Sequence, residues 1–250
     1  MHLPVVRGTI ERRILVNWRV EPRVLARLLP EPFEPKLVHG WGIAGVCLIR
    51  LGHLRPSFMP PFLGTTSENA AQRVAVQWRH DGERREGVYI PRRDTSSPLN
   101  AVVGGWLLPG AHHRAHFAVE EDGERFAVAM KSVDGESAIE VTGRRAAHLP
   151  ETSVFRSLQE ASRFFEQGSL AWSPTTEPAR FDGLELVSLE WSVEPLCVER
   201  VASSLFDDRR TFPEGTIAFD CALLMRDVAH EWHARGSLCC GSGPAVVLAP

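Results

Sequence analysis

The chain has 250 residues, of which 44% are hydrophobic and 24% are charged, and its formal net charge is −3. Such a composition is typical of a globular protein, and the lack of a clustered basic excess predicts no nucleic-acid partner. No run of residues approaches the ~20 apolar positions that a membrane-spanning helix needs. The first residues also lack the charged and then apolar layout of a signal peptide, so we expect no membrane association.

The five cysteines are an odd number for a chain of this length. Cys47, Cys197 and Cys221 lie in apolar, strand-like runs, which is typical of reduced thiols in a protein core rather than of a disulfide framework. Cys239 and Cys240 are adjacent and lack the spacing of metal ligands. The cysteines therefore predict a cytoplasmic location.

Strand patterns dominate the sequence. Alternating or β-rich runs bounded by Gly, Pro or charged residues predict strands at Thr9–Trp18, Trp41–Arg50, Arg73–Trp78, Gly87–Ile90, His113–Val119, Arg125–Lys131, Ala138–Thr142, Leu184–Val193 and Ile217–Met225. Asp-Gly pairs at positions 81–82, 122–123 and 134–135 fall between candidate strands, which indicates tight hairpin turns. The run from 112 to 142 therefore predicts a three-stranded antiparallel meander.

A short helix is predicted between Pro22 and Pro30, because proline suits the first helical position and stops a helix that reaches it from the N-terminal side. Leu25, Leu28 and Leu29 form one apolar stripe along it. We expect all three leucines to be buried against the sheet, since a short amphipathic helix is held in place by its packing.

Two further helices are expected. The capping-box pattern Ser157-Leu158-Gln159-Glu160 begins one of them, and Gly168 ends it. Another is predicted at 99–108, although it contains Gly104 and Gly105.

The pattern as a whole predicts a mainly β (α+β) protein. No linker rich in Pro, Ser or Gly is long enough to divide the chain, so residues 1–250 are expected to form a single domain. We expect a mostly antiparallel, closed or nearly closed sheet with a few short peripheral helices, because closure removes the exposed edges of so many strands.

Three segments share a pattern with one known enzyme family. Arg93-Asp94-Thr95-Ser96-Ser97-Pro98-Leu99-Asn100 places an arginine–acid pair and hydroxyl residues before a proline. Trp18-Arg19 precedes the first helix, and Pro30-Glu31-Pro32-Phe33 follows it; Ala202-Ser203-Ser204 is a weaker match. These segments resemble the acetoacetate decarboxylases, and residues 65–76 and 87–91 look like an uncharacterised bacterial branch of that superfamily. The resemblance implies an acetoacetate decarboxylase-like β-barrel with an internal cavity.

In the family that it resembles, two adjacent lysines follow the proline, and the first forms a Schiff base with the keto acid. Leu99 and Asn100 stand in their place here, with one residue fewer before the proline, and neither side chain can form an imine. The chain contains only two lysines, Lys36 in a Pro/Glu-rich loop and Lys131 at the end of a predicted strand, and both are expected to be solvated. The sequence therefore predicts a protein without Schiff-base chemistry.

The same segment supplies the candidate site. Arginine binds carboxylates bidentately. Neighbours on a strand alternate between its faces, so Arg92 and Arg93 cannot both point inward. The resemblance places the family's arginine at Arg93, so we expect Arg93 to point inward and to pair with Asp94. Glu68 lies in a region that contributes an acid to the cavity in the family, where burial would let it move protons. The predicted catalytic residues are therefore Glu68, Arg93 and Asp94, and the predicted substrate-binding residues are Asn69, Arg92, Ser96, Ser97 and Asn100.

Purely structural interpretations stay open for these residues. The Arg–Asp pair could pin a turn, and Glu68 could cap one. The position of the family's substrate-binding arginine falls at Glu11, with Arg12 and Arg13 beside it, so the binding of a keto acid is itself open.

Metal, cofactor and hydrolase chemistry are not expected. His112 and His116 share a strand face but lie too far apart for one ion, and nothing in the sequence brings them to His230 and His233. The glycine-rich segments lack the strand–loop–helix context of a phosphate-binding loop. No histidine is spaced to activate Ser96 or Ser97 as a nucleophile.

Two classes of function follow from these observations. One is an enzyme that acts on a small carbonyl or carboxylate compound by acid–base catalysis, and the other is a non-catalytic binding protein that kept the cavity. Both imply a small-molecule ligand, and assembly into a homo-oligomer is compatible with either.

Overall fold

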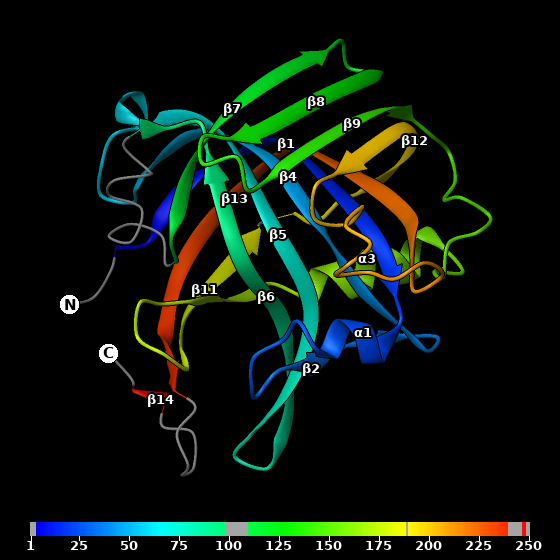
Figure 1. Ribbon diagram of the computed structural model, residues 1–250. Coiled ribbons are helices and arrows are strands. Elements are labelled where there is room, and N and C mark those ends of the chain that lie inside the picture. Colours follow the sequence, from blue (N-terminus) through cyan, green and yellow to red (C-terminus); the bar gives the residue numbers. More distant parts are fainter. Residues whose placement is uncertain (1–3, 99–109, 189, 240–246, 249–250) are drawn as a thin grey trace.

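The computed structural model describes residues 4–98, 110–188, 190–239 and 247–248. Strands make up most of it (Figure 1). The strands are β1 (Val6–Val20), β2 (Glu34–Pro35), β3 (Leu37–Val38), β4 (Trp41–Pro56), β5 (Thr65–His80), β6 (Glu83–Thr95), β7 (His112–Glu121), β8 (Arg125–Ser132), β9 (Ala138–Arg145), β10 (Leu170–Pro174), β11 (Arg180–Ser188), β12 (Glu194–Ser203), β13 (Ile217–Cys239) and β14 (Val247–Leu248). The helices are α1 (Pro22–Ala26), the 3-10 turn η1 (Pro61–Leu63) and α3 (Leu158–Glu166).

These strands form one 14-stranded sheet whose pairings close two rings rather than one simple barrel. The first ring runs β6-β7-β8-β9-β12-β13-β1-β4-β5 and closes through the pairing of β5 with β6. The second runs β11-β10-β6-β5-β4-β1-β13 and closes through β11 with β13. Five long strands, β13, β1, β4, β5 and β6, are therefore shared, and each presents one face to each ring.

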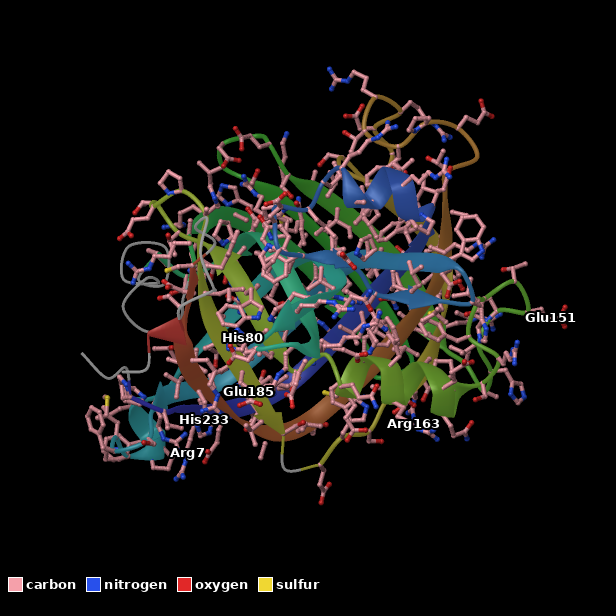
Figure 2. The ribbon with its side chains drawn as sticks, turned by 90° about the horizontal axis from the view of Figure 1, so that it is seen from below. Arg7, His80, Glu151, Arg163, Glu185 and His233 are labelled. Carbon is pink, nitrogen blue, oxygen red and sulfur yellow. The ribbon has the colours of Figure 1, made fainter. Side chains whose placement is uncertain are left out.

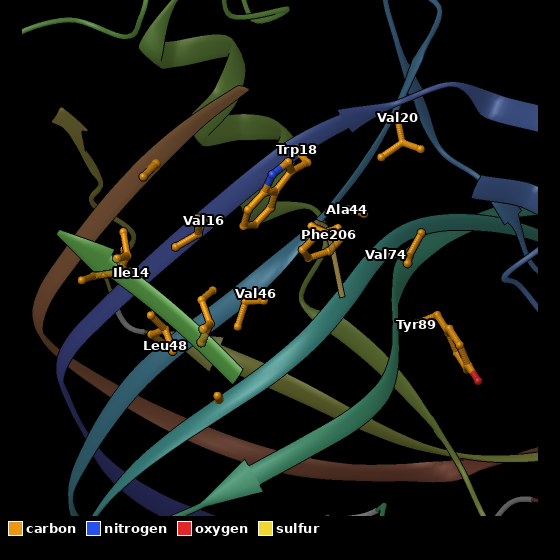
Figure 3. Close-up of a cluster of buried hydrophobic side chains, with 14 of the residues drawn as sticks. Ile14, Val16, Trp18, Val20, Ala44, Val46, Leu48, Val74, Tyr89 and Phe206 are labelled. Carbon is orange, nitrogen blue, oxygen red and sulfur yellow. The ribbon is translucent and has the colours of Figure 1, made fainter. Parts of the chain in front are cut away.

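Alternation along the shared strands divides their side chains between the two rings. Ile14, Val16 and Trp18 of β1 pack in the first ring with the meander β7–β9 (Figure 3). Leu15 faces the second ring, where it joins residues of β4, β11 and α3. The predicted mainly β class, the closed and mostly antiparallel sheet and the meander are confirmed, and the sheet closes as two rings that share a wall.

The Asp-Gly pairs form the predicted hairpin turns. Asp81 and Gly82 link β5 to β6 with φ of 51° and 80°, and Gly123 and Gly135 have φ of 94° and 77° in the next two turns. A positive φ is the conformation that such turns require and that glycine adopts without strain.

The first helix is shorter than expected. It ends at Ala26, and the amides of Arg27 and Leu28 then bond to the carbonyls three residues back, at 3.3 and 3.1 Å. This tighter turn changes the direction of the following side chains, so Leu25 is fully buried whereas Leu28 is 40% exposed. The predicted burial of Leu28 is wrong, and that of Leu25 is confirmed.

The second predicted helix is α3, and its N-terminus is capped as expected. Ser157 Oγ accepts a hydrogen bond from the amide of Glu160 at 3.1 Å, and Glu160 accepts one from the amide of Arg156 at 2.7 Å. The strand expected at Leu184–Val193 ends at Ser188 instead, and the helix expected at 99–108 lies outside the described residues. No helix in the described ranges is long and apolar enough to cross a membrane.

The described cysteines are free thiols. Cys47 and Cys221 are buried in the core, as predicted. Cys197 is exposed because it alternates with the buried Leu196 on β12, so its predicted burial is wrong.

Candidate functional site

A cavity of about 350 Å³ lies within the second ring. This volume is at the lower end of the range for small-molecule sites. Its wall includes Arg13, Cys47, Ile49, Asn69, Ala71, Arg73, Arg93 and Trp232 from the shared strands and His112 from β7. It also includes Ala171, Leu184 and Leu186 from β10 and β11, Phe165 from α3, and Trp191.

Arg93 reaches the cavity because strand β6 alternates. Its partner on β5 is Ala71 and its partner on β7 is His112, so these three side chains share the face of the second ring. Arg93 Nη2 donates to Ser173 Oγ at 3.1 Å. Gly110 lies against this pair: it has a φ of 97°, and a Cβ there would come within 2.8 Å of Ser173 Cβ, so glycine fits this position best.

Arg13 enters the cavity from β1. Its Nε donates to Cys47 Sγ at 3.2 Å, and its guanidinium lies 5.8 Å from the centre of the Trp191 ring. Arg13 stands two residues after Glu11, the position at which the resemblance places the family's substrate-binding arginine. Glu11 itself pairs with Arg50 at 2.8 Å, because a register shift between Ile10 and Arg12 interrupts the alternation of β1.

Arg73 is 4% exposed and reaches into the cavity from β5. Its Nη2 donates to Asn17 Oδ1 on β1, and its guanidinium lies 4.9 Å from the centre of the Phe165 ring on α3. Gly45 stands between the two partners on β4, where a Cβ would lie 2.1 Å from the carbonyl oxygen of Val16. Glycine at this position lets the hydrogen bond cross the intervening strand.

The three guanidinium groups have no carboxylate partner among the described residues. Each keeps one buried nitrogen without a hydrogen-bond partner there: Nη1 of Arg13, Nε of Arg73 and Nε of Arg93. Burial lowers the pKa of Arg73 and that of Arg93 to about 10, which leaves both charged at neutral pH. The cavity therefore holds an uncompensated positive charge, and buried charges are normally paired.

The acidic residues near the cavity do not compensate this charge. Glu185 pairs with Arg235, and Figure 2 shows it beside His233, its register partner on β13. Asp94 is held by Arg92, and Glu166 is exposed at the end of α3. The positive charge is thus a property of the cavity wall itself.

His112 supplies a neutral base at the same wall. Its Nδ1 lies 3.0 Å from the carbonyl oxygen of Gly110, and because a carbonyl only accepts, Nδ1 carries the proton and Nε2 keeps its lone pair. Burial, with the charge of Arg93, lowers the pKa of His112 to about 4. A neutral imidazole beside a cation can accept a proton from a bound compound.

Glu68 and Arg93 lie on opposite faces of the sheet. Glu68 points into the first ring, where one of its oxygens lies 2.5 Å from Nη2 of the buried Arg12. Its neighbour Asn69 faces the second ring, since side chains alternate. The prediction that Glu68 lines one cavity with Arg93 is therefore wrong.

Asp94 pairs with Arg92, not with Arg93 as expected. Residues two apart on a strand share a face, and Arg92 Nη2 contacts Asp94 at 2.9 Å and Asp134 at 2.7 Å, while its Nη1 contacts Glu136 at 3.0 Å. Burial raises the pKa of Asp94 although Arg92 opposes the shift. Arg92 is therefore engaged by carboxylates of the first ring, and the inward arginine is Arg93, as predicted.

The remaining predicted residues are divided. Asn69 lines the cavity, where its Oδ1 accepts from Thr95 Oγ1 at 2.8 Å. Ser96 Oγ instead accepts from the amide of Glu68 at 3.0 Å, and neither Ser96 nor Ser97 contributes to the cavity wall. Asn100 lies outside the described residues.

Lys36 is less solvated than expected. Its Nζ lies 2.5 Å from Glu86 Oε2 and 4.5 Å from the centre of the ring of Phe164, a residue of α3. Lys131 is exposed, so neither lysine belongs to the cavity wall described here. In the described part of the chain, no three His, Cys, Asp or Glu side chains are arranged to hold a metal ion.

The chain has an acetoacetate decarboxylase-like fold. The structure resembles the acetoacetate decarboxylase of Legionella pneumophila with a TM-score of 0.60 at 9% identity, covering 93% of this chain and 86% of that one. It resembles the enduracididine biosynthesis enzyme MppR, complexed with pyruvate, with a TM-score of 0.60 at 12% identity over 96% and 91% of the chains. An acetoacetate decarboxylase-like enzyme from Sphingomonas wittichii RW1 gives 0.58 at 12% identity over 99% and 93%.

Identities this low show the fold alone. A comparison with proteins of curated function finds no match in sequence. Residues 7–194 match the family DUF2071, described as an uncharacterized conserved protein, and the chain belongs to this family.

Proposed function

We propose that the cavity binds a small carboxylate or carbonyl compound through guanidinium groups, without Schiff-base chemistry. The observation that supports this most directly is the set of three inward arginines with unpartnered buried nitrogens in one cavity. Guanidinium matches a carboxylate bidentately, and a bound carboxylate would restore the missing hydrogen bonds and charge. No lysine contributes to the part of the cavity wall that the structure describes.

Acid–base catalysis in the cavity is the second candidate, and His112 favours it. Its Nε2 is available as a proton acceptor at neutral pH, next to Arg93, which would stabilise a developing oxyanion. A binding protein would need the arginines alone. Single-domain organisation, a cytoplasmic location and homo-oligomer assembly stay predictions.

Pyruvate is a suitable probe, because MppR is similar in fold and its solved structure holds pyruvate. We expect calorimetry to detect pyruvate binding to the wild type and none to Arg93→Ala, with the melting temperatures within a few degrees. Borohydride added with the keto acid should leave the protein mass unchanged. An adduct on Lys36 or Lys131, or unchanged binding by Arg93→Ala, would contradict the proposal.

The same samples separate an enzyme from a binding protein. In D₂O, a base in contact with pyruvate should exchange the methyl protons of the ligand, which proton NMR follows directly. Exchange that disappears in His112→Gln while binding persists indicates acid–base chemistry, and no exchange in the wild type indicates a binding protein.

A further inference from the structure

The cationic groups of the cavity form two separate poles. Arg13 and Arg73 form the first, on either side of strand β4, with Cys47 bonded to Arg13 and Asn17 bonded to Arg73. Arg93 forms the second, with Ser173 as its partner and His112 beside it. The two poles share no hydrogen-bond partner among the described residues.

The sheet register relates the backbone positions from which the two poles extend. Cys47, Ala71 and Arg93 stand side by side on β4, β5 and β6. Neighbouring strands are ~4.8 Å apart, so the backbone positions of Cys47 and Arg93 are separated by about 10 Å. Ala71 occupies the middle of this row, and its methyl group leaves open space between the poles.

The wall between the poles is apolar. Ala71, Ile49 and Leu186 line it from three different strands. An aliphatic segment of a ligand suits these three side chains, because its transfer from water is favourable there and none of the three offers a hydrogen bond to a polar group.

One acidic group can neutralise only one pole. A monocarboxylate bound at Arg93 would leave Arg13 and Arg73 buried without a counter-charge, and the reverse holds at the other pole. A single dianion such as phosphate has the charge but not the length to reach both. Two acidic groups joined by a short aliphatic chain would satisfy both poles and the apolar wall.

We infer that the ligand of this cavity is a small dicarboxylate, with one carboxylate at Arg13 and Arg73 and the other at Arg93. This inference rests on the proposed function and specifies its substrate class. It also explains why the cavity holds more than the one cation that a keto acid would need.

Calorimetric titrations at pH 7 test the inference with two series of matched chain length: succinate, glutarate and adipate against butyrate, valerate and caproate, with inorganic phosphate as a separate ligand. At least one dicarboxylate should bind ~10-fold or more tightly than its monocarboxylate counterpart, equivalent to about 1.4 kcal/mol. Arg93→Gln and Arg73→Gln should each remove this preference. Arg79→Gln is the matched control, because Arg79 is exposed on the same strand as Arg73, and it should keep the preference.

The outcomes separate the inference from the proposed function. Equal affinity for both series overturns the dicarboxylate inference and leaves the proposed function standing, as does a preference that survives both arginine substitutions. Phosphate binding more tightly than every dicarboxylate also overturns the inference in favour of one compact dianion. Failure of every carboxylate, pyruvate included, to bind overturns the proposed function as well.

Discussion

Arg92 and Arg93 are neighbours in the chain with opposite surroundings. Arg92 contacts the carboxylates of Asp94, Asp134 and Glu136. Arg93 hydrogen-bonds only to Ser173 Oγ among the described side chains, and its Nε is buried without a hydrogen-bond partner. Strand alternation alone produces this difference, because it sends one guanidinium into each ring.

The two arginines should therefore have opposite effects on stability when they are replaced by methionine. Arg92→Met leaves Asp94, 1% exposed, without its cation, and breaking such a pair costs ~3–5 kcal/mol. Arg93→Met removes a buried charge that lacks a counter-ion, and relief of such functional strain typically adds ~0.5–2 kcal/mol. Urea unfolding at pH 7 without ligand measures both.

Equal losses of unfolding free energy in the two variants would make Arg93 a structural residue. In that case the unpartnered nitrogens would carry no information about a ligand. Loss of pyruvate binding in Arg93→Met together with unchanged or higher stability would instead identify a residue kept for binding.

At the residue scale, the sequence predicted Arg93 but not its companions. Alternation allows only one of Arg92 and Arg93 to point inward, and the resemblance selects Arg93. Arg13 and Arg73 are more than 50 positions away from each other in the chain, and His112 is assigned to the cavity only by its parallel pairing with Arg93. That pairing and the register of β5 with β6 depend on contacts between segments far apart in the chain, which local patterns do not reveal. The prediction that Glu68 shares the cavity with Arg93 is wrong for the same reason.

At the scale of elements, α1 is anchored by its buried residues Val24 and Leu25, of which Leu25 is the more deeply buried. Leu25 is fully buried, and a Cβ added at Gly42 of β4 would lie 2.6 Å from its Cδ2. The glycine thus makes room for the leucine, and the contact attaches a helix of only five residues to the sheet. Helices this short gain their stability from packing rather than from their own hydrogen bonds.

Leu25 and Leu28 form a matched pair for testing this anchor. Leu25→Ala should lower the free energy of unfolding by ~2–5 kcal/mol, as expected for a core leucine. Leu28→Ala should change it by less than ~0.5 kcal/mol, because the side chain is 40% exposed. Urea denaturation of the two variants compares them directly, and similar losses would show that the C-terminal turn after α1 is packed as tightly as the helix.

Local sequence patterns located the elements better than their ends. Asp-Gly turns and alternation fix a hairpin within a few residues, which explains why the meander was predicted correctly. Strand β10 has only five residues, Leu170–Pro174, and ends in Trp-Ser-Pro without alternation. This short strand links β11 to β6 in the second ring, so one strand of the cavity wall is among the elements that periodicity could not predict.

At the scale of the whole molecule, the buried arginines of the two rings differ in whether they have carboxylate partners. In the first ring, Arg12 is 1% exposed and pairs with Glu68 and Glu121 at 2.5 and 3.1 Å. In the second ring, Arg13 and Arg73 have no ion pair among the described residues. One sheet thus separates an interior whose buried arginine is paired from a cavity whose arginines lack carboxylate partners among the described residues.

This cationic interior also keeps histidines neutral. His230 on β13 is 2% exposed, and burial, with the charge of Arg13, lowers its pKa to about 4. Below the ordinary histidine pKa of about 6.5, His230 is therefore protonated in the unfolded chain but stays neutral in the folded chain. Because the unfolded state binds more protons in this window, the free energy of unfolding must fall as the pH falls from about 6.5 toward 4.

Replacement of His230 by leucine should remove part of this pH dependence. Between pH 6.5 and 5, each histidine held neutral contributes a slope that approaches ~1.4 kcal/mol per pH unit, so His230→Leu should give a flatter curve than the wild type. Carboxylates with ordinary or lowered pKa values titrate mostly below this range. Urea unfolding at pH 7, 6 and 5 measures the slope, and His148→Gln serves as the control because His148 is exposed in the folded chain. An unchanged slope in His230→Leu, or an equal flattening in His148→Gln, would mean that burial in the second ring does not keep His230 neutral.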